Sequence, residues 1–214
     1  MSNCPFCLGQ IEPHPRLELV KGEQISVHER ILECGATSYL AAGLGALVYP
    51  YVLFITKRHI TGFAEANHAE RLEFFEMLDH CLAVGLFPSK SLCVFEHGGS
   101  GLESCSCVDH CHIHIVDGAF DMAKLLAASK PAAVPWVIDK STLSVPHVPT
   151  PYLWAAKYIQ GESKIEGIAL AAKGHGQQYF RRLLAAWIRG DQWDWRLFPR
   201  WDNIIKLINN WEGR

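Results

Sequence analysis

Three histidines alternate with apolar residues over positions 110–116, which read His-Cys-His-Ile-His-Ile-Val. In a β-strand successive side chains point to opposite faces, so His110, His112 and His114 would share one face while the residues between them pack in the core. Imidazole titrates near neutral pH and acts as base, acid, nucleophile or metal ligand. The pattern therefore predicts a strand that carries an active site. The alternatives are a solvated histidine-rich strand and a structural metal site.

A Cys-x-x-Cys motif near the N-terminus, Cys4 and Cys7, is a second candidate for chemistry. Two thiolates on one tight turn have the spacing of the first ligand pair in a tetrahedral zinc site. The sequence has no second motif of this kind, so histidines are the natural completion of the ligand set. A redox dithiol is the alternative, although we do not expect this motif to open a helix after a strand, as it does in thioredoxin-like proteins.

Several strands and helices must position these residues. Residues 51–56 and 91–96 are rich in β-branched and aromatic side chains and predict central strands. Between them, residues 64–84 carry apolar side chains at spacings of three and four, as in an amphipathic helix. The further predicted elements are a hairpin at 17–28, a helix at 120–129, a hairpin at 152–170 and helices at 177–188 and within 193–211. This order predicts an α+β fold in which helices flank an antiparallel sheet.

Composition limits the class of protein. The chain has 214 residues, is 49% hydrophobic and carries a formal charge of -2, so one soluble domain without a basic surface for a nucleic acid polymer is expected. We find neither an export signal nor a long apolar stretch, which predicts a cytoplasmic protein without a membrane span. In that compartment the eight cysteines are expected to be thiols or metal ligands rather than disulfides.

Five features, in this order, resemble the histidine triad (HIT) superfamily. They are Cys4-x-x-Cys7, a strand closing in Thr56-Lys57-Arg58-His59, the helix from Ala64, Glu96-x-Gly98, and the run from His110 to Val116. The resemblance implies one HIT-like domain over residues 1–214, with a core at 1–120 that holds the zinc knuckle and the triad. Residues 121–214 would then be a helical C-terminal extension of the same domain. The resemblance also implies a homodimer and a nucleotide or nucleotide conjugate as ligand.

The resemblance assigns different roles to the three histidines. His112 takes the position of the nucleophile that attacks the α-phosphorus of a nucleotide, and His114 that of the group that binds the phosphoryl oxygens or the leaving group. In zinc-containing members, the first histidine of the triad joins the earlier strand-end histidine and two cysteines. The implied ligands of a structural zinc ion are therefore Cys4, Cys7, His59 and His110.

The sequence departs from the family pattern at two places. Hydrolase members often carry Gly-Gln-Ser before the triad, whereas this chain has Cys-Ser-Cys at 105–107, which leaves Ser106 as the candidate hydrogen-bond donor to phosphate. The usual Gly-His ahead of the Lys-x-His strand is replaced by Pro50-Tyr51, which puts the usual ribose pocket in doubt.

Two other residues are candidates for substrate binding. His97 directly follows Glu96 and could line the pocket. Arg181 could bind a phosphate, because guanidinium pairs with phosphate in a bidentate manner. A solvated helix face is the alternative for Arg181.

The function implied by the resemblance is hydrolysis of a nucleoside phosphoanhydride or phosphoramidate through a covalent nucleotidyl-histidine. His114 stands where transferase branches carry Gln, which favours hydrolysis. Three alternatives stay open. They are a nucleotidyltransferase that acts on a phosphorylated acceptor, as in the galactose-1-phosphate uridylyltransferase type, a non-catalytic nucleotide-binding protein, and a metalloprotein in which all three triad histidines bind one metal.

Overall fold

The computed structural model describes residues 4–7, 30–101, 105–106, 108–129, 133–148 and 150–212. The hairpin predicted at 17–28 lies outside these ranges. None of the helices in the described part of the chain has the length and apolar character that a membrane span requires.

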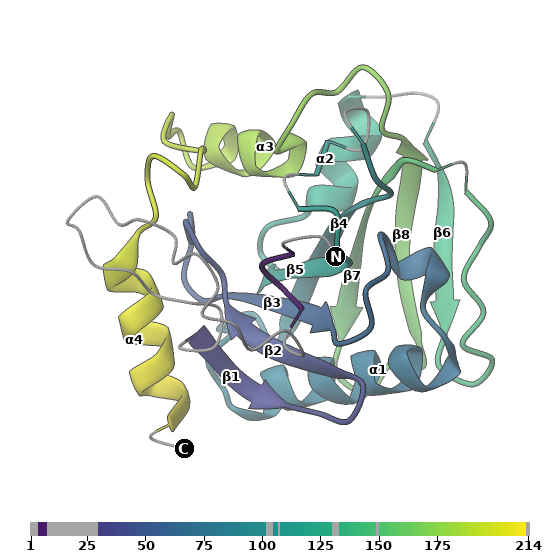
Figure 1. Ribbon diagram of the computed structural model, residues 1–214, viewed down its shortest axis with the longest axis horizontal. Helices are drawn as coiled ribbons and strands as arrows, with labels where there is room; N and C mark the ends of the chain where they lie inside the picture. Colours follow the sequence, from purple (N-terminus) through teal and green to yellow (C-terminus); the bar gives the residue numbers. More distant parts are fainter. Residues whose placement is uncertain are drawn as a thin grey trace.

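One antiparallel sheet of eight strands, in the order β1-β2-β3-β5-β4-β7-β8-β6, forms the centre of the molecule (Figure 1). The strands are β1 (Ile31–Cys34), β2 (Ser38–Ala42), β3 (Tyr51–Thr56), β4 (Ser91–Gly98), β5 (His112–Asp117), β6 (Val134–Asp139), β7 (Tyr152–Ile159) and β8 (Lys164–Ala171). The helices are α1 (His68–Ala83), α2 (Met122–Ser129), α3 (Tyr179–Trp187) and α4 (Trp201–Glu212). The predicted α+β class is confirmed.

The helix predicted over 64–84 is α1, and its start is set by local chemistry. Asn67 accepts a hydrogen bond from the backbone N–H of Glu70, and the Glu70 carboxylate accepts one from the backbone N–H of Asn67. This reciprocal capping box satisfies two of the free N–H groups at a helix end. A separate 3-10 turn, Phe63–Glu65, occupies the first part of the predicted range.

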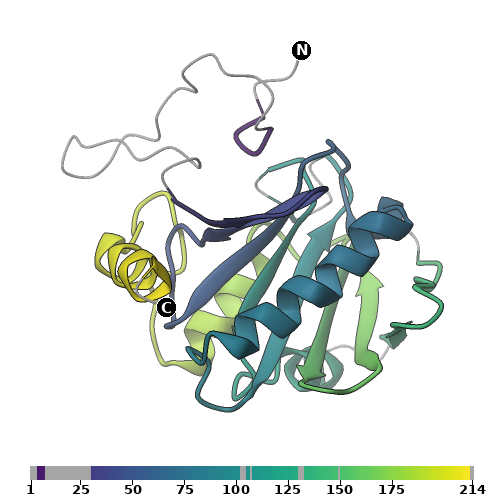
Figure 2. The ribbon, with the colours of Figure 1, turned by 90° about the horizontal axis from the view of Figure 1, so that it is seen from below.

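The two faces of the sheet belong to different cores. On β3, Val52 and Phe54 pack in the core beneath α1, whereas Tyr51, Leu53 and Ile55 pack in the core formed with α2 and α3. In Figure 2, α1 crosses the near face of the sheet and α3 lies behind it. Because strand side chains alternate between faces, the position of each residue along β3, β4 and β5 decides which core it enters.

The C-terminal half of the chain completes the sheet. The hairpin predicted at 152–170 is confirmed as β7 and β8, and β7 pairs with β4 along its length. The extension therefore contributes strands as well as the expected helices. Strand β6 was not predicted, because it is an edge strand with a proline, Pro135, and with Val134 and Val137 exposed.

Candidate functional site

His112 and His114 lie on the central strand β5, on the face covered by α2 and α3. Each is 7% exposed, while Cys111 and Ile113 pack in the opposite core beneath α1. The predicted alternation is thus confirmed for this strand. His110 lies two residues before β5 begins, and its side chain approaches the N-terminal turn.

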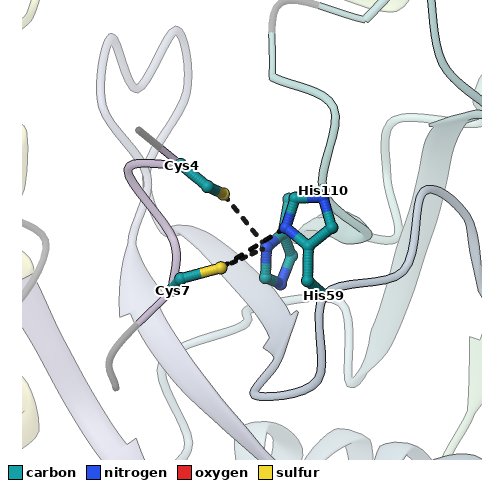
Figure 3. A group of neighbouring side chains, drawn as sticks. All are labelled: Cys4, Cys7, His59 and His110. Atoms are coloured by element: carbon teal, nitrogen blue, oxygen red, sulfur yellow. Dashed lines mark hydrogen bonds between the residues drawn. The ribbon is translucent and has the colours of Figure 1, made fainter. Parts of the chain in front are cut away.

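Cys4, Cys7, His59 and His110 converge, and one donor atom of each lies within 4.8 Å of the others (Figure 3). Sγ of Cys4 is 3.2 Å from Nδ1 of His110, and Sγ of Cys7 is 3.3 Å from Nδ1 of His59 and 3.6 Å from Nδ1 of His110. Bonds of about 2.3 Å to sulfur and 2.0 Å to nitrogen place the ligands of tetrahedral zinc roughly 3.3–3.8 Å apart. The spacing and the donor types therefore fit a zinc ion.

The orientation of His110 also suits a metal. Its Nε2 lies 2.6 Å from the carbonyl oxygen of Thr56, which can only accept, so Nε2 carries the proton and Nδ1 presents a lone pair toward the cysteines. Burial lowers the pKa of His110 to about 4, which keeps the ring neutral at pH 7. Burial and the Cys4 thiol raise the pKa of Cys7 to about 11, so a cation beside Cys7 is needed to ionise its thiol at neutral pH.

His112 is held by the backbone of His110. Its Nδ1 lies 2.7 Å from the carbonyl oxygen of His110, so Nδ1 donates and Nε2 is left with a free lone pair. Burial lowers the pKa of His112, and the ring is neutral at pH 7. Phe6, between the two cysteines, packs on this ring at a centroid distance of 5.2 Å.

His114 is fixed on two sides. Phe95, its direct neighbour across β4 and β5, stacks on it at 4.9 Å with an interplanar angle of 12°. The Tyr51 hydroxyl lies 2.9 Å from its Nδ1. Burial, followed by the effect of His112, holds the pKa of His114 well below its usual range. The His112 and His114 rings are 5.1 Å apart, which places two neutral imidazoles side by side.

The structure brings His97 into the same group but ties Ser106 to its own loop. The His97 ring is 6.1 Å from that of His114, and its Nε2 accepts a hydrogen bond from the backbone N–H of Phe180 on α3. Burial lowers the pKa of His97 to about 3. The Ser106 hydroxyl donates to the carbonyl oxygen of Val108 at 2.7 Å. Position 107 lies outside the described residues.

Arg181 is 3% exposed, so the alternative of a solvated helix face is wrong. Its Nε donates to the carbonyl oxygen of Trp193, its Nη2 to that of Gly45, and its Nη1 to the Tyr51 hydroxyl. Arg181, which belongs to the C-terminal half of the chain, therefore contacts the site through the hydroxyl of Tyr51.

Sequence reasoning missed three aromatic residues around the histidines, namely Phe6, Tyr51 and Phe95. The alternation along residues 91–98 was a usable signal for Phe95, because it places this residue on the same face as His97. The sequence gives no comparable signal for Tyr51, whose position beside His114 depends on the register of β3 against β5.

No protein-family model and no curated protein matches this sequence. Several solved structures are similar in part, including the following three. A HIT family hydrolase from Clostridium thermocellum is 18% identical, with 55% of this chain and 91% of that chain covered and a TM-score of 0.39. A hypothetical histidine triad nucleotide-binding protein from Sulfolobus tokodaii is 15% identical, with 41% and 59% covered and a TM-score of 0.34. A structure described as a Hit-like protein is 18% identical, with 41% and 84% covered and a TM-score of 0.32.

Proposed function

We propose that this chain is a nucleotidyl hydrolase of histidine triad type, in which His112 attacks the α-phosphorus of a nucleoside phosphoanhydride or phosphoramidate. The observation that carries this proposal is the hydrogen bond from Nδ1 of His112 to the His110 carbonyl oxygen. This bond leaves Nε2 unprotonated, and a neutral imidazole is a competent nucleophile at pH 7.

The reaction has two displacements. In the first, a bond forms between Nε2 of His112 and phosphorus, and the bond from phosphorus to the leaving group breaks with its electron pair. In the second, water attacks phosphorus, the histidine–phosphorus bond breaks, and a nucleoside monophosphate is released. The proton that water loses balances the one that the leaving group takes up. His114 supports both steps as a neutral hydrogen-bond donor to the phosphoryl oxygens or the leaving group.

Zinc bound by Cys4, Cys7, His59 and His110 would have four protein ligands, and its contribution would be structural. It would attach the N-terminal turn to His110, two residues before the catalytic strand. The alternative in which one metal binds all three triad histidines is disfavoured, because Nδ1 of His110 faces the cysteines while Nδ1 of His112 faces a carbonyl.

Turnover of dinucleoside polyphosphates and nucleoside phosphoramidates tests the proposal. We expect the wild type to release nucleoside monophosphate and the His112→Ala variant to release none above background, while its zinc content stays at the wild-type level. His147→Ala, which removes an exposed histidine, is the matched control and should behave as the wild type. Wild-type turnover by His112→Ala, or loss of zinc from that variant, would contradict the assignment.

Mass spectrometry of the protein after incubation with the same substrates, together with a measurement of nucleotide binding, separates the remaining alternatives. Formation of the covalent adduct without hydrolysis would indicate a transferase that needs a phosphorylated acceptor. Nucleotide binding without adduct or turnover would indicate a non-catalytic binding protein. The homodimer stays a prediction, which sedimentation equilibrium checks.

A further inference from the structure

Arg181 is a buried cation that the described structure surrounds with oxygen atoms of neutral groups. Its three donor nitrogens contact two backbone carbonyls, of Trp193 and Gly45, and the hydroxyl of Tyr51. Among the described residues, no carboxylate forms an ion pair with it. Burial of a charge without a counter-ion is unfavourable. A role for this guanidinium in the site would account for its presence there.

The contact with Tyr51 fixes the direction of the next hydrogen bond. A guanidinium only donates, so the Tyr51 oxygen accepts from Nη1 of Arg181 at 3.4 Å. The guanidinium carbon also lies over the Tyr51 ring, 5.8 Å from its centroid. Among the described residues, the hydroxyl proton of Tyr51 has one acceptor in reach, Nδ1 of His114 at 2.9 Å. Tyr51 therefore donates to Nδ1.

A His114 that accepts at Nδ1 carries its proton on Nε2. His112 has the opposite arrangement, because its Nδ1 donates to a carbonyl and its Nε2 is free. We propose that Arg181, through Tyr51, is a positioning residue that holds His114 as the Nε2–H tautomer, so that it donates to the substrate beside the free Nε2 of His112. Its effect on the reaction rests on the function proposed above.

Two glycines make room for this arrangement. A Cβ at Gly43 would lie 2.3 Å from the Tyr51 ring, and one at Gly45 would lie 2.7 Å from Nη2 of Arg181. Gly45 also has a φ of +69°, which side-chain-bearing residues rarely adopt. The segment between β2 and β3 thus lets the Tyr51 ring and the Arg181 guanidinium approach the backbone closely.

The arrangement gives the C-terminal half of the chain a role in the site. Arg181 comes from α3 and is held by Trp193, which follows that helix, while Tyr51 and His114 lie on adjacent central strands. Helix α3 also places Phe180 against His97 and Phe95. Arg181 and Phe180 are thus the residues through which α3 contacts the histidine site.

Nitrogen-15 NMR of the histidine rings tests the tautomer directly, without substrate, at pH 8. We expect the wild type to show His114 protonated at Nε2 and unprotonated at Nδ1. In Tyr51→Phe, which removes only the hydroxyl, and in Arg181→Met, the preference should weaken and Nδ1–H should become populated. Arg181→Lys should retain part of the preference. Arg182→Lys is the matched control, because Arg182 is the next residue on α3 and bonds to the carbonyl of His175.

The kinetic readout is a fall in kcat of about 10- to 100-fold in Tyr51→Phe, with a smaller change in KM. An Nδ1–H tautomer in the wild type, or an unchanged tautomer in Tyr51→Phe, would overturn the inference whatever the activity. The expected tautomer shifts without turnover of any substrate tested would instead sink the proposed function and leave the positioning of His114 intact. Circular dichroism verifies that each variant is folded.

Discussion

The backbone carbonyl of His110 lies 2.7 Å from Nδ1 of His112, while the side chain of the same His110 faces Cys4 and Cys7. One residue thus contributes its imidazole to the candidate metal cluster and its carbonyl oxygen to the candidate nucleophile. We expect a shift of the His110 ring to move the carbonyl oxygen of the same residue, and with it the partner of Nδ1 of His112. This contact couples the two parts of the site and leads to the first prediction.

Loss of the metal cluster should impair the nucleophile. Cys7→Ser is expected to reduce bound zinc from about one ion per chain to a small fraction, and to lower activity about 10- to 100-fold, because the His110 carbonyl is no longer held. Elemental analysis and the hydrolysis assay are the measurements. Cys34→Ser, which alters an exposed cysteine outside the cluster, should leave both at the wild-type level. A zinc-free Cys7→Ser variant with full activity would show that the cluster and the nucleophile are independent.

Phe6 should support His112 through packing. Its ring lies 5.2 Å from that of His112 and 5.9 Å from that of His110. The side chain is buried, and the residue lies between the two cysteines in the sequence. Phe6→Ala is expected to lower the free energy of unfolding by about 3 kcal/mol and to reduce activity, since it opens a cavity beside the proposed nucleophile. Phe6→Leu should restore most of both. Urea unfolding and kcat are the measurements. A Phe6→Ala variant that matches the wild type in the free energy of unfolding and in kcat would rule out a supporting role.

Gly43 should be required for the position of Tyr51. Gly43→Ala places a Cβ 2.3 Å from the Tyr51 ring, so the ring must shift from its present position. We expect lower thermal stability and the same change in the His114 tautomer as in Tyr51→Phe. Gly190→Ala is the control, because a Cβ there meets no atom closer than 3.6 Å. Thermal melting and NMR of the two alanine variants provide the comparison, and equal behaviour of the two would refute the close approach at Gly43.

Glu96 should make stability depend on pH. Its carboxylate is buried on the α1 face and accepts hydrogen bonds from Phe63, Cys111, Tyr152 and Trp154. Burial raises its pKa from 4.5 to about 7, with the four donors opposing the shift. Between these values the folded chain retains a proton that the unfolded chain has released, so the free energy of unfolding falls as pH rises through this window.

Comparison with Glu96→Gln isolates this effect, because all other titrating groups are common to both proteins. The variant places an amide NH₂ among hydrogen-bond donors and should be less stable than the wild type at pH 5.5. This deficit in the free energy of unfolding should shrink by on the order of 2 kcal/mol by pH 8, because the wild type alone loses stability as the pH rises. Urea unfolding at the two pH values measures the deficit. A constant deficit would mean that Glu96 keeps an ordinary pKa in the folded state, and a growing deficit would equally contradict the raised pKa.

The parts of the fold and the site that depend on local pattern could be predicted from the sequence. Alternation identified β5 and its two faces, the spacing of apolar residues identified α1, and the Cys-x-x-Cys turn indicated a cluster that the resemblance completed with His59 and His110. Strand β6 escaped prediction because it is an edge strand interrupted by Pro135, and its pairing with β8 is not recorded in the local sequence.

The contact between Arg181 and Tyr51 could not be predicted from the sequence, for a related reason. The two residues are 130 positions apart in the chain, and nothing in the sequence around either one records the other. The pairing of β4 with β7 adds the C-terminal half to the sheet, and α3 then packs on the face that carries the histidines. Sequence reasoning left a solvated helix face open for Arg181, because local polarity cannot show which long-range partner a charged side chain meets.

Trapping of the covalent intermediate tests the central claim most directly. The wild type is mixed with a dinucleoside polyphosphate or a nucleoside phosphoramidate, quenched in denaturant at alkaline pH, digested and analysed by mass spectrometry. The account predicts one nucleoside monophosphate group on the imidazole of His112, with no adduct in His112→Ala. An adduct on a different residue, or steady turnover with no adduct on any peptide, would contradict it.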